Sequence, residues 1–194
     1  SVAQIFKDPR MLLLSLIYFC VIMGQYGLTF WMPTLIKASG VSGVLNIGLL
    51  SAVPYIVAIF AMLGFGRSSD RTGERRWHVI IPMLMGAVGY LIVAMSGEHV
   101  AVALIGLSLA AAGVITPGPL FWALPSAFLV GSAAAAGVAA INAFAGLAGF
   151  VSPYFIGWLR DLTHSSTIAM YVSAGVLLIG ALLVLAIPAK LVNR

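Results

Sequence analysis

Charged residues are scarce in this sequence. Only 8% of its 194 residues are charged and 62% are hydrophobic, whereas a soluble domain carries about 25% charged residues. The composition therefore predicts an integral membrane protein. The net charge of +5 is also typical of nucleic-acid-binding proteins, but in membrane proteins basic residues mark the cytoplasmic loops. We therefore expect no nucleic acid among the partners.

Cysteine and clustered histidine are also scarce. Cys20, the one cysteine, falls inside an apolar run, so this chain by itself forms neither a disulfide framework nor a cysteine metal site. His78, His99 and His164 stand singly, without paired carboxylates, an H-E-x-x-H motif or a phosphate-binding G-x-x-x-x-G-K-[ST] motif. An enzyme would need a nucleophile and base, or several metal ligands, at one depth. We expect neither an enzyme nor a metal or other cofactor.

Ionisable side chains are missing from the middle of every apolar run. All charged residues and all histidines fall in loops or at the ends of the runs. Because ionisable groups inside the membrane mark ion pathways and proton relays, we expect the groups that bind a proton or neutralise an anion to lie outside these 194 residues.

The runs themselves are long. Crossing a bilayer as a helix takes about 20 mostly apolar residues, and six such runs occur, at residues 11–35, 47–65, 79–96, 100–124, 133–158 and 168–187. They predict an all-α membrane protein in which residues 1–194 form one domain of six transmembrane helices. The first and fourth runs are interrupted by Gly and Pro. Transporters built from inverted repeats of three helices show this pattern near their binding site.

The connection 66–78, between the second and third runs, holds four arginines and predicts the topology. If it is cytoplasmic, eight of the ten Lys and Arg residues lie on that side, together with both chain ends. The positive-inside rule favours this orientation, and we expect a multi-pass protein of the cytoplasmic membrane. The other side then holds Lys37 and Arg160.

The same connection has a fixed spacing, G-x-x-x-D-R-x-G-x-R-R. We predict that six of its residues form a conformational gating set: Gly66, Asp70, Arg71, Gly73, Arg75 and Arg76. Gly66 would allow close helix contact where the span ends. Asp70 would cap a helix or pair with an arginine, and Gly73 would allow a tight turn. Such a latch favours one conformation and breaks in another.

Four polar or aromatic residues within the spans are candidates for substrate binding: Gln25, Tyr26, Trp122 and Asn142. Buried Gln25 needs a partner or a water-filled cavity, and we favour the cavity. Asn142 either bonds across to another helix or lines a polar cavity. It lies in the fifth span, whose many Ala and Gly residues predict close packing against other helices.

The spacing of the gating set resembles the signature loop of the major facilitator superfamily. With it, the stretches 30–37 (FWMPTLIK) and 48–55 (GLLSAVPY) resemble the second half of such a transporter, and more narrowly the anion:cation symporter branch, which imports organic acids with protons. The resemblance covers the whole chain but only six of the family's usual twelve helices. It implies a carboxylate-binding arginine and proton-carrying acids in the absent half, with Gln25, Tyr26, Trp122 and Asn142 holding the rest of the substrate.

The sequence thus predicts half of a secondary transporter that imports organic carboxylates with protons by alternating access. Its partners would be a small organic acid, protons, the lipid bilayer and an N-terminal six-helix half. The chain starts without methionine, and we expect it to be a piece of something larger. Two alternatives remain open: a facilitator transporter of sugars or drugs, and a membrane scaffold that transports nothing.

Overall fold

The computed structural model describes residues 8–127, 129 and 131–193, and within them the chain is built of helices without a strand. The helices are α2 (Pro9–Ala38), α3 (Val44–Thr72), α4 (Arg76–Met95), α5 (Val100–Ile115), α6 (Pro117–Phe121), α7 (Ala123–Ser126), α8 (Ser132–Thr163), α9 (Thr167–Leu185) and α10 (Ala189–Val192). Six helical segments are long and apolar enough to cross a membrane, with α5 to α7 counted as one. The predicted all-α, six-span fold class is confirmed.

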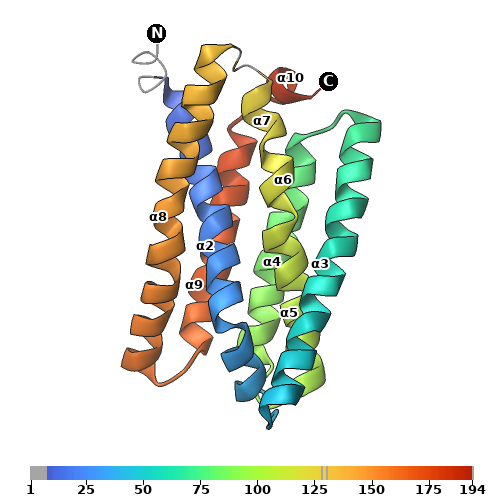
Figure 1. Ribbon diagram of the computed structural model, residues 1–194, viewed down its shortest axis with the longest axis vertical. Coiled ribbons are helices and arrows are strands. Elements are labelled where there is room, and N and C mark those ends of the chain that lie inside the picture. Colours follow the sequence, from blue (N-terminus) through green and yellow to red (C-terminus); the bar gives the residue numbers. More distant parts are fainter. Residues whose placement is uncertain (1–7, 128, 130, 194) are drawn as a thin grey trace.

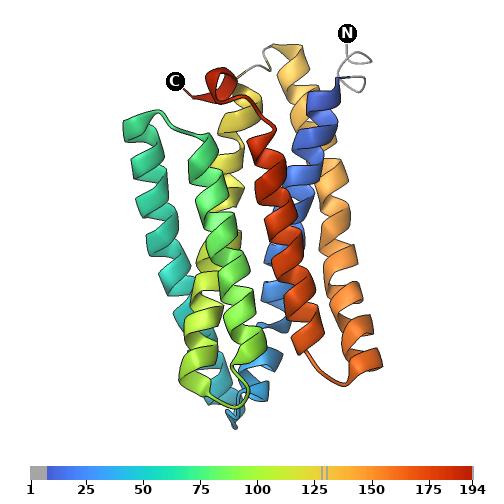
Figure 2. The ribbon, with the colours of Figure 1, turned by 180° about the vertical axis from the view of Figure 1, so that it is seen from behind.

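The six spans run side by side along the long axis of the molecule (Figure 1). One end carries both termini, α10 and the α3–α4 connection, and we call it the termini end. The other end, the opposite end, carries the connections α2–α3, α4–α5 and α8–α9. The view from behind shows the same arrangement (Figure 2). The basic connection and the chain ends therefore share one end, as the charge count predicts.

Only one of the two helices that we expected to be interrupted is interrupted. The fourth span breaks into α5, α6 and α7, because Pro117, Pro119 and Pro125 each remove a backbone N–H from the helical ladder. By contrast, α2 continues for 30 residues with Pro33 inside it. A single proline near the helix end leaves most of the ladder intact.

The backbones of α4 and α5 approach closely, at a contact that the sequence analysis did not predict, while the Ala- and Gly-rich fifth span, α8, packs along α2. A Cβ at Gly89 would clash with the backbone of Ala110, and one at Gly113 would clash with the backbone of Gly86. In α8 a Cβ at Gly146 would meet no described atom within 4 Å outside its own helix. Only 22% of the most apolar stretch of α8 is buried, and 11% of that of α3. Small residues allow close approach, but whether helices meet there depends on the neighbouring helix.

Candidate functional site

The α3–α4 connection is shorter than predicted. Helix α3 continues to Thr72 and α4 starts at Arg76, so residues 66–72 are helical rather than loop. Gly73 ends α3 with a φ of 68°, and its N–H donates to the Ser69 carbonyl at 3.0 Å. A left-handed residue at this position favours glycine. A Cβ at Gly66 would meet no described atom within 4 Å outside its own helix, so its role in close helix contact stays a prediction.

Asp70 pairs with an arginine across this turn. Nη1 of Arg75 lies 2.6 Å from Oδ1 of Asp70 and also donates to Oγ of Ser69 at 3.0 Å. Oγ of Ser69, which is buried, donates in turn to the carbonyl of Glu74 at 2.9 Å. The Asp70 side chain is 75% exposed, and an exposed ion pair contributes about 0–1 kcal/mol to stability. Of the two roles expected for Asp70, the structure shows the ion pair.

The helix cap that we assigned to Asp70 is made by Glu74. Its carboxylate accepts hydrogen bonds from the backbone N–H of Trp77 at 2.9 Å and of His78 at 3.2 Å. Nδ1 of His78 lies 2.9 Å from the same carboxylate, and Nε2 of His78 lies 2.9 Å from Oγ of Ser68 on α3. An acidic residue just ahead of a helix is a known capping signal. Sequence reasoning missed this cap because Glu74 falls at an unspecified position of the G-x-x-x-D-R-x-G-x-R-R spacing.

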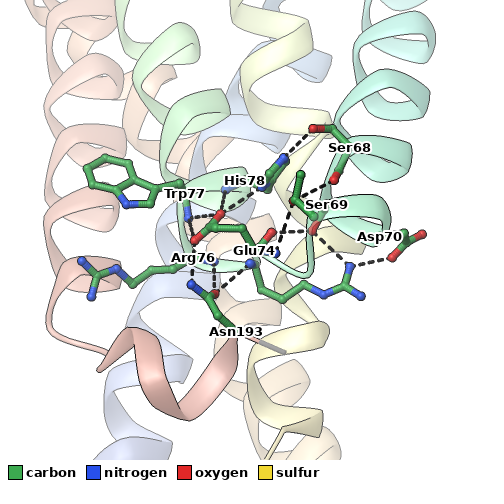
Figure 3. Close-up of polar contacts among 10 residues, drawn as sticks. Ser68, Ser69, Asp70, Glu74, Arg76, Trp77, His78 and Asn193 are labelled. Carbon is green, nitrogen blue, oxygen red and sulfur yellow. Dashed lines mark hydrogen bonds and ion pairs between the residues drawn. The ribbon is translucent and has the colours of Figure 1, made fainter.

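The C-terminal segment closes this network from the other side (Figure 3). The backbone N–H groups of Arg75 and Arg76 donate to Oδ1 of Asn193 at 2.9 and 3.3 Å, and Nδ2 of Asn193 donates to Glu74 at 3.1 Å. Nη1 of Arg76 donates to the carbonyl of Ile187 at 3.0 Å. The turn between α3 and α4 is therefore bonded to the segment that follows α9. No local signal could reveal a partner 117 to 119 residues away.

The pKa of Glu74 predicts how this network responds to acid. Burial raises the pKa of its carboxyl, but hydrogen bonds from Trp77, His78 and Asn193 outweigh burial, and the pKa lies below the ordinary value of 4.5. A carboxyl with a lowered folded-state pKa stabilises the fold above its unfolded pKa, and this contribution is lost as the pH falls through the folded value.

We expect Glu74→Gln to lower the free energy of unfolding by about 1–2 kcal/mol at pH 7, because an amide is a weaker acceptor for the helix N–H groups. The difference from the native chain should shrink as the pH drops below 4.5. Thermal unfolding of the detergent-solubilised chain at pH 7 and pH 4 measures this. Glu98→Gln, at an exposed acid of the opposite end, is the control. Equal melting of native and Glu74→Gln protein at pH 7 would contradict the capping role.

The four predicted substrate residues lie on three elements. Gln25 is half-buried and Tyr26 is 40% exposed, both on α2, and Tyr26 stacks on Phe30 with ring centroids 6.2 Å apart. Trp122 lies between α6 and α7, and Asn142 lies on the exposed face of α8. The side-chain amides of Gln25 and Asn142 form no hydrogen bond within the described residues. The bond across to another helix, one of the alternatives for Asn142, is not made within this part of the chain.

Trp122 belongs to an aromatic cluster that sequence reasoning did not foresee. Tyr18 of α2 stacks on Phe121 with centroids 4.6 Å apart and meets Trp122 edge-on at 5.0 Å. The cluster joins α2 to the interrupted span. Tyr18 and Gln25 are seven residues apart on α2, which places them on the same side of that helix.

Helix α2 is held at its middle by two hydroxyls. The hydroxyl of Tyr90 on α4 donates to the carbonyl of Gly24 at 2.6 Å, and Oγ of Ser152 on α8 donates to the carbonyl of Met23 at 2.6 Å. Both bonds lie next to Gln25 in the chain. They fix α2 between α4 and α8, and they were missed because the partners are 66 and 129 residues away.

Comparison with known proteins agrees with this architecture. Residues 1–153 match the model of the Major Facilitator Superfamily. The chain is 41% identical, over 97% of its length, to "Putative metabolite transport protein NicT" of Pseudomonas putida, and 44% identical, over 95%, to a "Putative tartrate transporter" of Agrobacterium vitis. It is also 37% identical, over 95%, to a "Quinolone resistance transporter" of Acinetobacter baumannii.

These relatives are longer than the chain, which covers 43%, 41% and 42% of their lengths. The match to the family model extends over most of the chain, and the relatives are transporters rather than enzymes. The chain therefore belongs to the major facilitator superfamily.

Proposed function

We propose that residues 1–194 are the C-terminal six-helix domain of a secondary transporter that imports organic carboxylates together with protons. The observation that carries this proposal is the 44% identity, over 95% of the chain, to a protein named as a tartrate transporter. A second relative of that name from the same organism is 43% identical over 92%. The proposed location is the cytoplasmic membrane, with the termini end facing the cytoplasm.

The gating set and its partners support alternating access. The network around Glu74 joins α3, α4 and the segment after α9 at the termini end. Each bond is individually weak, and several are exposed. A conformational change that moves the α3–α4 turn away from the segment after α9 would break the three bonds to Asn193 together, which is how a bistable element behaves.

The surface of the bundle supports a second domain. Helices α3 and α8 are the least buried spans, and they expose large apolar side chains such as Phe60 of α3 and Phe150 of α8. We propose that an N-terminal six-helix half covers part of these faces and that lipid covers the rest. That half would supply the anion-binding charge and the proton carrier, because an unpaired charge in the membrane is costly.

Uptake by the full-length transporter that contains this chain tests the substrate class. Native protein should accumulate labelled tartrate under an imposed pH gradient, and an uncoupler should abolish the accumulation. Asn142→Ala should raise the half-saturation concentration about fivefold through the loss of one hydrogen bond. Asn46→Ala, at an exposed asparagine near the start of α3 that bonds only to the Ser42 carbonyl, is the matched control. Tartrate uptake that does not depend on the pH gradient would contradict proton coupling.

A drug-transporting function is the second candidate, because the relative named as a quinolone resistance transporter is 37% identical over 95% of the chain. A competition experiment distinguishes the carboxylate-transporting function from the drug-transporting function. If the protein carries carboxylates, excess tartrate should inhibit uptake and a quinolone should not. Inhibition by the quinolone alone would favour the second candidate.

A further inference from the structure

Arg160 holds an unusual position at the opposite end of the bundle. It lies in the last turn of α8, where its guanidinium carbon stacks 4.4 Å from the ring centroid of Trp31 on α2. Gly157, one turn earlier in α8, approaches the edge of the same ring. A guanidinium on an aromatic face gains about 0.5–2 kcal/mol. The stacking fixes the plane of the charged group and leaves its edges available to acceptors.

The guanidinium edges of Arg160 have no hydrogen-bond acceptor among the described residues. Nε of Arg160 and Nε1 of Trp31 are both buried, and neither donates a hydrogen bond to the described protein. No described acid forms an ion pair with Arg160 either. Leaving a buried donor unbonded is costly, whereas the donor fork of a guanidinium matches the two oxygens of a carboxylate or phosphate. Arg75 and Arg76 differ in that their Nη1 atoms donate to partners within the chain, although Nε of Arg76 is likewise buried without a described acceptor.

A cavity lies beside this pair. It has a volume of about 360 Å³ and is bordered by the ends of α2, α4, α8 and α9. Its polar lining includes Arg160, His164, Ser165, Ser166 and Thr167. Arg160 and His164 also line a more open depression of about 500 Å³. Cavities of about 300–1,000 Å³ accommodate small organic ligands.

Two acids border the same region. Glu98 lines the cavity and Asp161 lines the depression. Both are exposed to solvent and neither forms an ion pair with Arg160. Water screens the charges of these two exposed carboxylates. The guanidinium of Arg160 on Trp31 is partly buried, and its charge is screened less.

We propose that Arg160, held on the face of Trp31, binds a small oxyanion at the opposite end of the bundle. The group recognised is a carboxylate or a phosphate. It could come from a free organic acid or from a lipid headgroup, because this end of the bundle lies near the membrane surface. The proposal does not rest on transport, since binding can be measured without it.

Binding to the full chain in lipid nanodiscs tests the proposal in two arms. The first arm measures labelled tartrate and inorganic phosphate by equilibrium dialysis in phosphatidylcholine nanodiscs. The second counts phosphatidylglycerol molecules that remain bound after extraction from mixed nanodiscs, by native mass spectrometry. Each arm compares the native chain with Arg160→Gln. Lys37→Gln, which removes one exposed charge of the same end outside this cavity, is the matched control.

We expect Arg160→Gln to weaken binding at least about tenfold in one arm, because a charge-assisted bond is lost, with Lys37→Gln unchanged. An effect on tartrate and phosphate identifies a site for free anions, and an effect on phosphatidylglycerol alone identifies a headgroup site. Equal binding by the native chain and Arg160→Gln in both arms would overturn the proposal.

If Arg160→Gln does not insert, the native chain itself provides the test. The indole N–H resonance of Trp31, assigned with Trp31→Phe, should shift when the anion of either arm is added. An unchanged resonance with tartrate, phosphate and phosphatidylglycerol would equally overturn the proposal.

Discussion

Gly113→Ala is expected to destabilise the bundle strongly. A Cβ at this position would clash with N and Cα of Gly86 and would lie 2.5 Å from the carbonyl oxygen of Pro82. All of these are backbone atoms of α4, so no side chain can rotate away, and α4 and α5 would have to separate along a shared apolar face. Overpacking a well-packed core costs about 1–3 kcal/mol, and sometimes more; we expect the upper part of this range.

Abundance in the membrane fraction and thermal unfolding in detergent both measure this effect. Gly175→Ala in α9 is the matched control, because a Cβ there would meet no described atom within 4 Å and alanine is the better helix former. We expect the control to reach native abundance and Gly113→Ala to fall well below it. Native melting of Gly113→Ala would mean that the α4–α5 contact is looser than the structure shows.

Asp70→Asn is expected to reduce uptake by the full-length transporter about tenfold while membrane abundance stays near native. The exposed pair with Arg75 contributes little to folding. A change of about 1.4 kcal/mol in the equilibrium between conformations is sufficient for a tenfold effect on a population. Abundance and initial uptake rate, measured on the same membranes, separate a gating defect from a folding defect.

The control for Asp70→Asn is Arg67→Gln, one turn earlier on α3 at an exposed residue outside the gating set. If any loss of charge in this region slowed uptake, both variants would be slow. A charge exchange, Asp70→Arg with Arg75→Asp, further tests the pair itself and should recover part of the rate. Normal uptake by Asp70→Asn would show that the carboxylate is only a solvated surface charge.

Local patterns in the amino-acid sequence were sufficient to predict the fold class and the ends of the bundle at which the charged residues lie. Six apolar runs are a local property, and each must satisfy its own backbone hydrogen bonds as a helix in a membrane. Gly73 could likewise be assigned to a turn because its neighbours are polar and glycine tolerates a left-handed backbone. The boundaries were less predictable, since residues 67–72 contain neither Gly nor Pro and α3 continues to Thr72.

Contacts between residues far apart in the chain could be identified only from the three-dimensional structure. Asn193 reaches Glu74 across 119 residues, Ser152 reaches the Met23 carbonyl across 129, and Arg160 of α8 comes to lie on Trp31 of α2. The tight α4–α5 contact has the same origin. Small residues show where helices are able to approach each other closely. Which helices become neighbours depends on how six helices of similar hydropathy pack together. No local sequence pattern specifies that packing.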